Sequence, residues 1–391
     1  MVRMSDILRR IGIGAKPEPR KPQEEDKPKG DLKEESGKGA SGGLSPEDRG
    51  KKAAEGGVRI AKAMTQREGL AKEGERISIS QAMRDTQLDP ADSQRIYGRG
   101  RELMEEILKK AQRNEPPDLK EVCALIESIV QRLVLGDNEL LSLAIGSATE
   151  NYLAAHSLNV TILSVEIGLG KGYNKSRLSE LGLCAFLYDI GMAEVMDLAS
   201  QPRLLSKEEY ARIKQHPLRS QEILRRMEGV SQAVLDVARQ HHERLRGQGY
   251  PDGLRSDEIS EYSRIISLCD VYEALIHARP HRTQLDSHDA IKHILAMNSE
   301  GYFDAGNVKV MIKKLGIFPV GSWVELNTGE IGKVISANED FPLRPNLSII
   351  FNMNKQRYPQ AKMAVLPKQQ SIYIKRPVDL RDLGLDSQSS L

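Results

Sequence analysis

The chain has 391 residues and a formal net charge of only +2, from 57 basic and 55 acidic side chains. This length suits two domains, or one domain with extensions, and the charge balance gives no indication of binding to a nucleic-acid duplex or a membrane surface. The three cysteines, Cys123, Cys184 and Cys269, are scattered and form no Cys-x-x-Cys pair. They argue against a disulfide framework or a zinc ribbon and predict free thiols in a reducing cytosol.

Residues 1–75 are predicted to be a disordered segment. They are made largely of Lys, Glu, Gly, Pro, Ser and Ala, and the first aromatic residue of the chain is Tyr97. Such a composition buries too little apolar surface to offset the entropy of ordering. The opening "MVRMSDILRRIGIG" is a poor secretory signal, because Arg9 and Arg10 break its apolar stretch. With no run of about 18 apolar residues to predict a transmembrane segment, we expect a cytoplasmic protein.

Helices are predicted from residue 76 to residue 315. They form a helical extension over 76–137 and an all-helical domain over 138–315. Apolar residues between Val122 and Leu133 recur every three or four positions, as on one helix face. Glu209 follows Ser206 by three residues, which is the pattern of a helix N-terminal capping box. Further helices are predicted over 139–152, 158–168, 178–187, 218–227, 231–242, 259–277 and 288–298.

The pattern changes after Gly316. "GSWVELNTGEIGKVIS", "NLSIIFNM", "AKMAVLP" and "SIYIKRP" are short β-branched or alternating runs, separated by turn residues and prolines. They predict a small β domain of four or five strands over 316–378, followed by a tail over 379–391. The fold class is therefore mainly α, with a small C-terminal β domain.

Histidines and carboxylates in the helical domain form the chemically informative pattern. Each of them lies within or at the end of a predicted core helix: His156, Asp189, His216, His241, His242 and Asp270. Singly, most would be ordinary core or surface residues, but an unpaired buried carboxylate is costly and two adjacent histidines are unusual in a chain with eight. Imidazole and carboxylate together suit iron, manganese or zinc. The set predicts a metal centre.

These motifs resemble the HD-GYP family, a subgroup of the HD-domain metal-dependent phosphohydrolases. The matching stretches are "HSLNV" at His156, "LYDIGM" at Leu187, "HP" at His216, "HHERLRGQGYPDGL" at His241 and "RIISLCDVYEALIHARPHR" at Arg264. The resemblance implies that the six residues named above bind two divalent metal ions, iron or manganese, with Asp189 as a bridging and catalytic ligand. It also implies contacts to a cyclic dinucleotide, typically cyclic di-GMP, from Gly249, Tyr250, Pro251, Arg279 and Arg282.

The chain departs from the family pattern at several positions. Tyr188 stands where the family has the histidine of its His-Asp pair, Met192 replaces a lysine, and Arg246 replaces an aspartate. Tyr152, four residues before His156, replaces an acidic residue of three-metal members, so we expect no third metal. We expect a metal-dependent cyclic di-GMP phosphodiesterase, weakened by these changes. The alternative is a catalytically inactive module that binds cyclic di-GMP or a protein; a homodimer or a signalling partner stays open.

Overall fold

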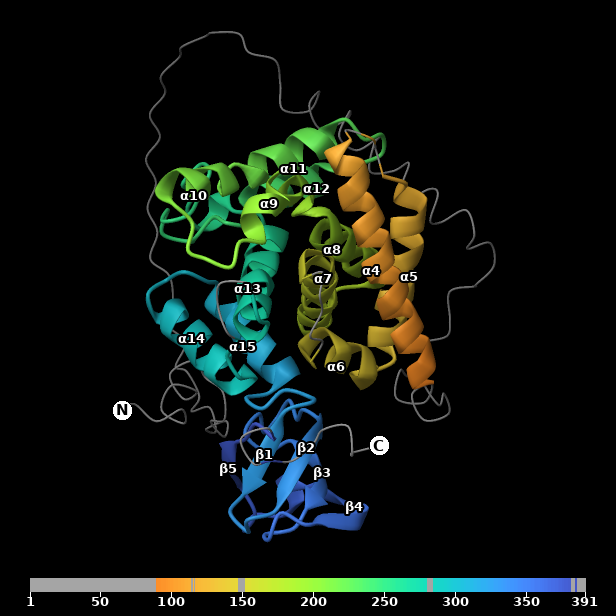
Figure 1. Ribbon diagram of the computed structural model, residues 1–391, viewed down its shortest axis with the longest axis vertical. Coiled ribbons are helices and arrows are strands. Elements are labelled where there is room, and N and C mark those ends of the chain that lie inside the picture. The colour runs from red at the N-terminus through yellow and green to blue at the C-terminus, as the bar shows by residue number, and fades with distance from the viewer. Residues whose placement is uncertain are drawn as a thin grey trace, which may run out of the picture. The chain divides into compact units, whose positions relative to one another are not determined.

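The computed structural model describes residues 89–113, 115, 117–146, 152–279, 284–380 and 384. The predicted disordered segment, the start of the helical extension and most of the 379–391 tail lie outside these ranges. Within them the chain is mainly helical up to residue 315 and forms a small sheet after it, as predicted (Figure 1).

The helical part contains long core helices and several short ones. They are α4 (Pro90–Gln112), α5 (Leu119–Val134), α6 (Asn138–Gly146), α7 (Tyr152–Gly170), α8 (Lys175–Leu187), α9 (Met196–Ala199), α10 (Lys207–Ile213), α11 (His216–Arg225), α12 (Gln232–Gln240), α13 (Glu261–Ile276), α14 (Ser287–Ser299) and α15 (Ala305–Leu315), with 3₁₀ turns η1 (Ile190–Val195) and η2 (Ser256–Glu258). The capping box of Ser206 and Glu209 is present at the start of α10.

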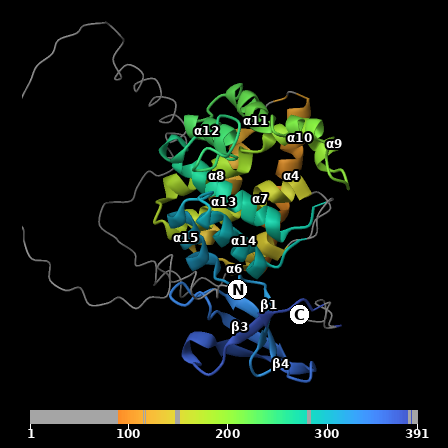
Figure 2. The same ribbon diagram turned by 90° about the vertical axis from the view of Figure 1, so that its left-hand side faces the viewer.

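Helix α7 is the centre of this domain. It lies between α13 on one side and α4 and α5 on the other, and it also packs against α8, α6 and α15 (Figures 1 and 2). Its residues 153–170 are long and apolar enough to span a membrane, but 83% of that stretch is buried inside the domain. A mostly apolar helix that is covered on every side is expected at the middle of a core, so burial against its neighbours accounts for the high apolar content of α7.

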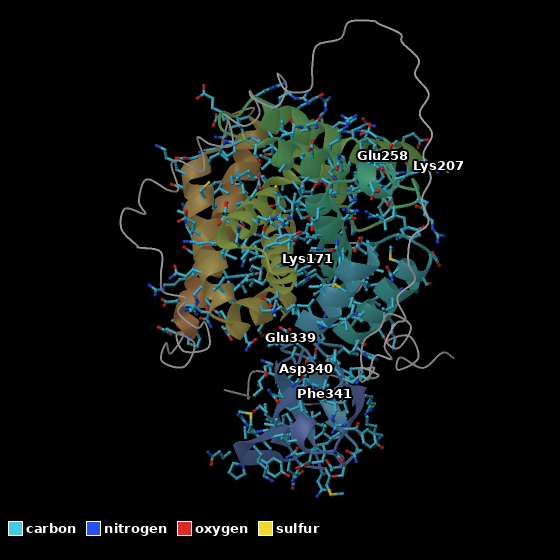
Figure 3. All side chains as sticks on the ribbon, turned by 180° about the vertical axis from the view of Figure 1, so that it is seen from behind. Lys171, Lys207, Glu258, Glu339, Asp340 and Phe341 are labelled. Atoms are coloured by element: carbon cyan, nitrogen blue, oxygen red, sulfur yellow. The ribbon has the colours of Figure 1, made fainter. Side chains whose placement is uncertain are left out.

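The end of α7 is tied to two later helices by Lys171, which is labelled in Figure 3. Its ammonium group donates to Asn307 Oδ1 of α15 at 3.0 Å and pairs with Glu261 Oε1 at the start of α13 at 3.3 Å. These contacts join segments that lie 90 and more residues apart in the chain.

The β part is one five-stranded antiparallel sheet in the order β4-β3-β2-β1-β5. Its strands are β1 (Trp323–Leu326), β2 (Ile331–Ser336), β3 (Asn346–Phe351), β4 (Arg357–Val365) and β5 (Ile374–Pro377), with a 3₁₀ turn η3 (Leu366–Lys368). Ile331, Ile350, Phe351 and Leu380 form a small buried cluster against Trp323.

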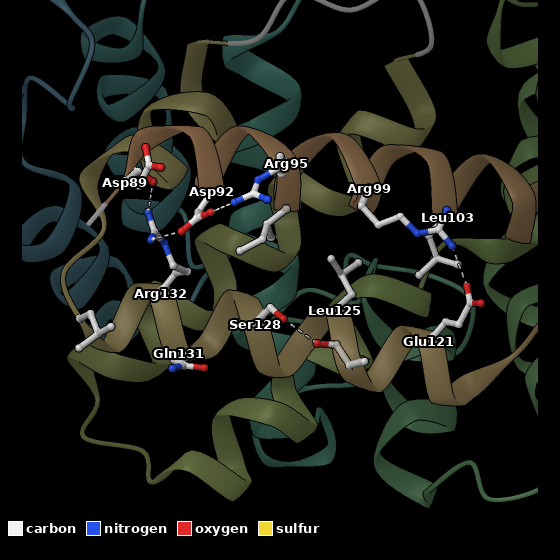
Figure 4. Close-up of a pocket in the computed structure, with 13 residues that line it drawn as sticks. Asp89, Asp92, Arg95, Arg99, Leu103, Glu121, Leu125, Ser128, Gln131 and Arg132 are labelled. Atoms are coloured by element: carbon white, nitrogen blue, oxygen red, sulfur yellow. Dashed lines mark hydrogen bonds and ion pairs between the residues drawn. The ribbon is translucent and has the colours of Figure 1, made fainter. Parts of the chain in front are cut away.

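A groove runs along the surface between α4 and α5, and charged side chains cross it (Figure 4). At one end Arg132 donates to the carbonyl oxygen of Asp89 at 2.9 Å and, more deeply, to Asp137 Oδ2 at 2.5 Å. Asp137 also accepts from Ser93 Oγ at 2.7 Å and caps α6 through the Leu140 amide at 3.0 Å. One buried carboxylate therefore links α4, α5 and α6.

We expect Asp137→Ala to lower the free energy of unfolding by about 3 kcal/mol, because it leaves the buried Arg132 guanidinium without its carboxylate. Asp118→Ala is the matched control, since Asp118 caps α5 from an exposed position and its loss should cost about 1 kcal/mol. Urea denaturation of the three proteins measures both values. Equal losses at the two positions would mean that the buried network contributes no more than an ordinary cap.

Candidate metal centre

Five separate parts of the helical domain supply the six predicted metal ligands. His156 lies in the second turn of α7, and His216 begins α11. Asp189 directly follows Tyr188, the C-cap residue of α8. His241 caps the end of α12, His242 follows it, and Asp270 lies in α13. Five of the six are buried, and His242 is partly exposed.

Gly191 allows α11 to approach the turn that carries Asp189. A methyl group on this glycine would lie 2.4 Å from the carbonyl oxygen of His216 and 2.5 Å from the amide nitrogen of Ser220. The Gly191 amide also donates to Ser220 Oγ at 2.9 Å. Because no side chain fits between the two backbones, His216 is held beside Asp189, with His216 Nε2 and Asp189 Oδ1 3.2 Å apart.

The imidazoles of His216, His241 and His242 converge. His216 Nε2 lies 3.0 Å from His241 Nε2 and 3.1 Å from His242 Nε2. The other ring nitrogen of His216 faces the Ile213 carbonyl at 2.6 Å, and that of His241 faces the Ala238 carbonyl at 3.0 Å. Since a carbonyl only accepts, each Nδ1 carries a proton, and in a neutral imidazole the Nε2 then presents a lone pair.

Two lone pairs that face each other at 3.0 Å repel unless a cation lies between them. Burial, followed by the neighbouring His216, lowers the pKa of His241 to about 3, and burial also lowers the pKa of His242 well below its usual value. Both imidazoles therefore stay neutral, which is the form that binds metals. In the described part of the chain, these three residues form a group whose ligand atoms all lie within 4.8 Å of one another.

Asp189 adds a carboxylate to the same place. Its Oδ1 is buried and has no hydrogen-bond donor. Burial raises the pKa of Asp189 to about 6, while His216, His156 and Arg279 act in the opposite direction. A buried carboxylate oxygen without a donor is costly, and a cation beside it would remove that cost. The side chains present thus fit a metal ion held by three imidazoles and one carboxylate.

His156 and Asp270 also lie together, but around Tyr188. The phenol oxygen of Tyr188 lies 2.8 Å from His156 Nε2 and 3.0 Å from Asp270 Oδ1, and the latter two atoms are 3.0 Å apart. Burial, followed by the charges of Asp270 and Asp189, raises the pKa of Tyr188 well above its usual value. This buried phenol is therefore protonated and donates a hydrogen bond.

Glu273 is a buried residue of this region that the motif pattern did not identify. Its carboxylate contacts His156 Nδ1 and accepts from Asn159 Nδ2 at 2.9 Å. Burial opposes a charge on His156, but Glu273 and Asp270 outweigh it and raise the pKa of His156 to about 10. Glu273 lies one helical turn after Asp270 on α13, so a spacing of three residues was the signal available in the sequence.

The loop of residues 249–254, called the lip below, holds the predicted substrate contacts Gly249, Tyr250 and Pro251 and lies next to His242. The ring of Tyr250 stacks on the His242 imidazole, with ring centroids 4.7 Å apart. Gly249 allows this, because a methyl group there would lie 2.4 Å from the Cα of Glu243. The buried Glu243 was also missed as a functional residue. Its carboxylate accepts from the amides of three consecutive residues, Asp252 (2.7 Å), Gly253 (3.1 Å) and Leu254 (3.0 Å).

Positive charge near the centre comes from Arg244, Arg279 and Lys214, and Arg244 is among the charges that lower the pKa of His242. Arg279 is close enough to Asp189 to lower its pKa, whereas Arg282 lies outside the described residues. Lys214, which no motif predicted, has its ammonium nitrogen 4.9 Å from the centre of the Tyr250 ring. Among the other departures from the family pattern, Met192 is buried and Arg246 is exposed.

Comparison with known proteins agrees with this geometry. Residues 145–306 match the family model of the HD domain, and residues 323–385 match that of a KOW domain associated with the HD domain. A cyclic di-GMP phosphodiesterase of Pseudomonas aeruginosa is 29% identical over 66% of this chain and 62% of its own length. Cyclic di-GMP phosphodiesterase PdeB of Borreliella burgdorferi is 31% identical, over 52% of this chain and 54% of its own.

A third relative acts on a different dinucleotide by name. The 3'3'-cGAMP-specific phosphodiesterase 1 of Vibrio cholerae is 31% identical over 46% of this chain and 43% of its own length. This chain thus spans less than two thirds of each of these relatives. Together with the motifs and the convergent ligands, the matches confirm the resemblance to the HD-GYP family, with residues 145–306 matching an HD domain.

Proposed function

We propose that this chain is a metal-dependent phosphodiesterase that hydrolyses a cyclic dinucleotide. The observation that carries the proposal is the convergence of three imidazole Nε2 atoms and the carboxylate oxygen of Asp189, which has no hydrogen-bond donor, at one point. Asp189, His216, His241 and His242 would hold the ion. A bound ion of this kind polarises a phosphate oxygen and makes water a nucleophile near neutral pH.

The residues around the cluster suit a substrate with bases and phosphates. The flat ring of Tyr250, already stacked on His242, offers a face to a base. Arg279 and Lys214 bring positive charge from two elements, and a guanidinium matches the geometry of a phosphate. Glu243 fixes the lip that contains Gly249, Tyr250 and Pro251 by accepting three of its amides. Arg282, on the segment after Arg279, is proposed as a further phosphate contact.

The names of the relatives support hydrolysis over a non-catalytic module, since each is a phosphodiesterase of a cyclic dinucleotide. Cyclic di-GMP is the proposed substrate, and 3'3'-cGAMP is the competitor that the comparison suggests. Iron or manganese as the metal, a cytoplasmic location and a homodimer or signalling partner stay predictions, and two ions is the number that the family resemblance implies. The domain limits at residues 76, 138, 316 and 379 are proposed on the change of sequence pattern.

Full-length protein prepared without oxygen and loaded with manganese(II) should convert cyclic di-GMP to a linear product. Asp189→Ala should lower that rate by more than about 100-fold, the range expected for one positioned group. Liquid chromatography of the products measures the rate, with 3'3'-cGAMP assayed in parallel. Product formation that is unchanged in Asp189→Ala would remove the proposed site.

Bound metal is expected to disappear when His241 and His242 are both changed to alanine, because two of the four proposed ligands are then lost. His293→Ala is the matched control, since His293 is an exposed histidine of α14. Elemental analysis of the desalted proteins gives the metal content. An equal content in the double variant and in His293→Ala would refute the ligand assignment.

Glu243→Gln is expected to loosen the lip, because the amide that replaces one carboxylate oxygen cannot accept from a backbone N–H. Hydrogen exchange at the amides of Asp252, Gly253 and Leu254 should become faster. The expected change is about tenfold for each 1.4 kcal/mol by which the free energy of opening the loop falls. Asp257→Asn is the control, since the side chain of Asp257 is fully exposed nearby. Protection that survives at all three amides would show that Glu243 does not hold this loop.

A further inference from the structure

We propose that this centre holds one metal ion, bound by Asp189, His216, His241 and His242, and that the Tyr188 hydroxyl occupies the position of a second ion. The inference rests on the proposed function, because it concerns the same centre. It differs from the family resemblance, which implies two ions. The argument depends on how the two halves of the centre satisfy their polar atoms.

The half around His216 has contacts that a bound metal ion would relieve. Its Nε2 faces two other imidazole nitrogens at 3.0 and 3.1 Å, and its own proton is already directed at a carbonyl. The nearby Oδ1 of Asp189 has no donor. Neither feature is stable in a dry interior without a positive charge.

The half around His156 is satisfied by the chain itself. Both ring nitrogens of His156 face carboxylates, those of Glu273 and Asp270. The Tyr188 hydroxyl donates to Asp270 Oδ1 at 3.0 Å and lies 2.8 Å from His156 Nε2. Among the described residues, no polar side-chain atom of His156, Tyr188 or Asp270 is buried without a partner. This half therefore has no unpaired buried polar atom that a bound ion would stabilise.

The reach of the side chain explains why tyrosine blocks this position. A tyrosine oxygen lies roughly 2 Å farther from Cα than the Nε2 of a histidine does, and this is about the length of a metal–nitrogen bond. The phenol oxygen thus extends to the point where an ion bound by an imidazole at residue 188 would lie. Its distances of 2.8 and 3.0 Å to His156 and Asp270 are those of hydrogen bonds and exceed metal–ligand bonds of about 2.0–2.2 Å.

The phenol ring cannot easily turn away to admit an ion. Tyr188 is fully buried, and its ring packs edge-on against the His241 imidazole with centroids 4.7 Å apart. Any rotation of the ring would displace a ligand of the half that does bind metal. The two halves are therefore linked, and filling the second position would disturb the first.

Metal stoichiometry tests this directly. The full chain is incubated with excess manganese(II), or with iron(II) without oxygen, then desalted and analysed for ions per chain. We expect one ion for the wild type, one for Tyr188→Phe, which has no phenol ligand to offer, and close to two for Tyr188→His. Circular dichroism confirms that each variant is folded.

Two ions in the wild type would overturn the inference. So would a visible charge-transfer band in the iron(III) form of the wild type that is lost in Tyr188→Phe, because it would identify Tyr188 as a metal ligand. Both measurements use the wild type, so they do not depend on the folding of Tyr188→His. One ion without turnover would sustain this inference and refute the proposed function. Two ions with turnover would refute this inference and sustain the proposed function.

Discussion

The architecture of this domain depends on placing three imidazoles in its interior with their lone pairs turned toward one another. His216, His241 and His242 come from two helices and from the turn after one of them, and each ring is fixed by what surrounds it. Such an arrangement is unfavourable in an apolar environment unless it is completed by a positive charge. The buried oxygen of Asp189 adds to the same requirement. Stability and chemistry are thus coupled at this point, because the ion that activates water would also relieve the core.

Much of the fold could be predicted because it depends on local patterns. The apolar spacing between Val122 and Leu133 predicted α5, which the structure confirms as Leu119–Val134. The pair of Ser206 and Glu209 predicted a capping box, and both of its hydrogen bonds are present. Around His156 the prediction placed the helix boundaries differently: it gave helices over 139–152 and 158–168, where the structure has α6 over Asn138–Gly146 and α7 over Tyr152–Gly170. Polar residues buried inside α7 hid its continuity, since helical periodicity is weak when every side is buried.

The candidate site also has a part that the sequence predicted and a part that it did not. The residue types and their order in the motifs were sufficient to select the histidines and carboxylates, which do lie together. The partners that orient them were not predictable, because their contacts join distant segments. Glu273 meets His156 across 117 residues, and the choice of that carboxylate over others follows only from the packing of α13 on α7. The effect of Tyr188 likewise depends on its distance to His156 and Asp270, which no spacing in the sequence expresses.

The order His241, His242, Glu243 in the chain has a mechanical consequence. Two residues that face the ion are followed at once by the residue whose carboxylate gathers three amides of the lip. The Tyr250 amide also donates to the carbonyl oxygen of His242 at 3.3 Å. We therefore expect a change in the backbone at the histidines to be transmitted to the surface that is proposed to meet the substrate. Loss of the ion would change the shape of this surface, so a centre without metal would also bind the proposed cyclic dinucleotide poorly.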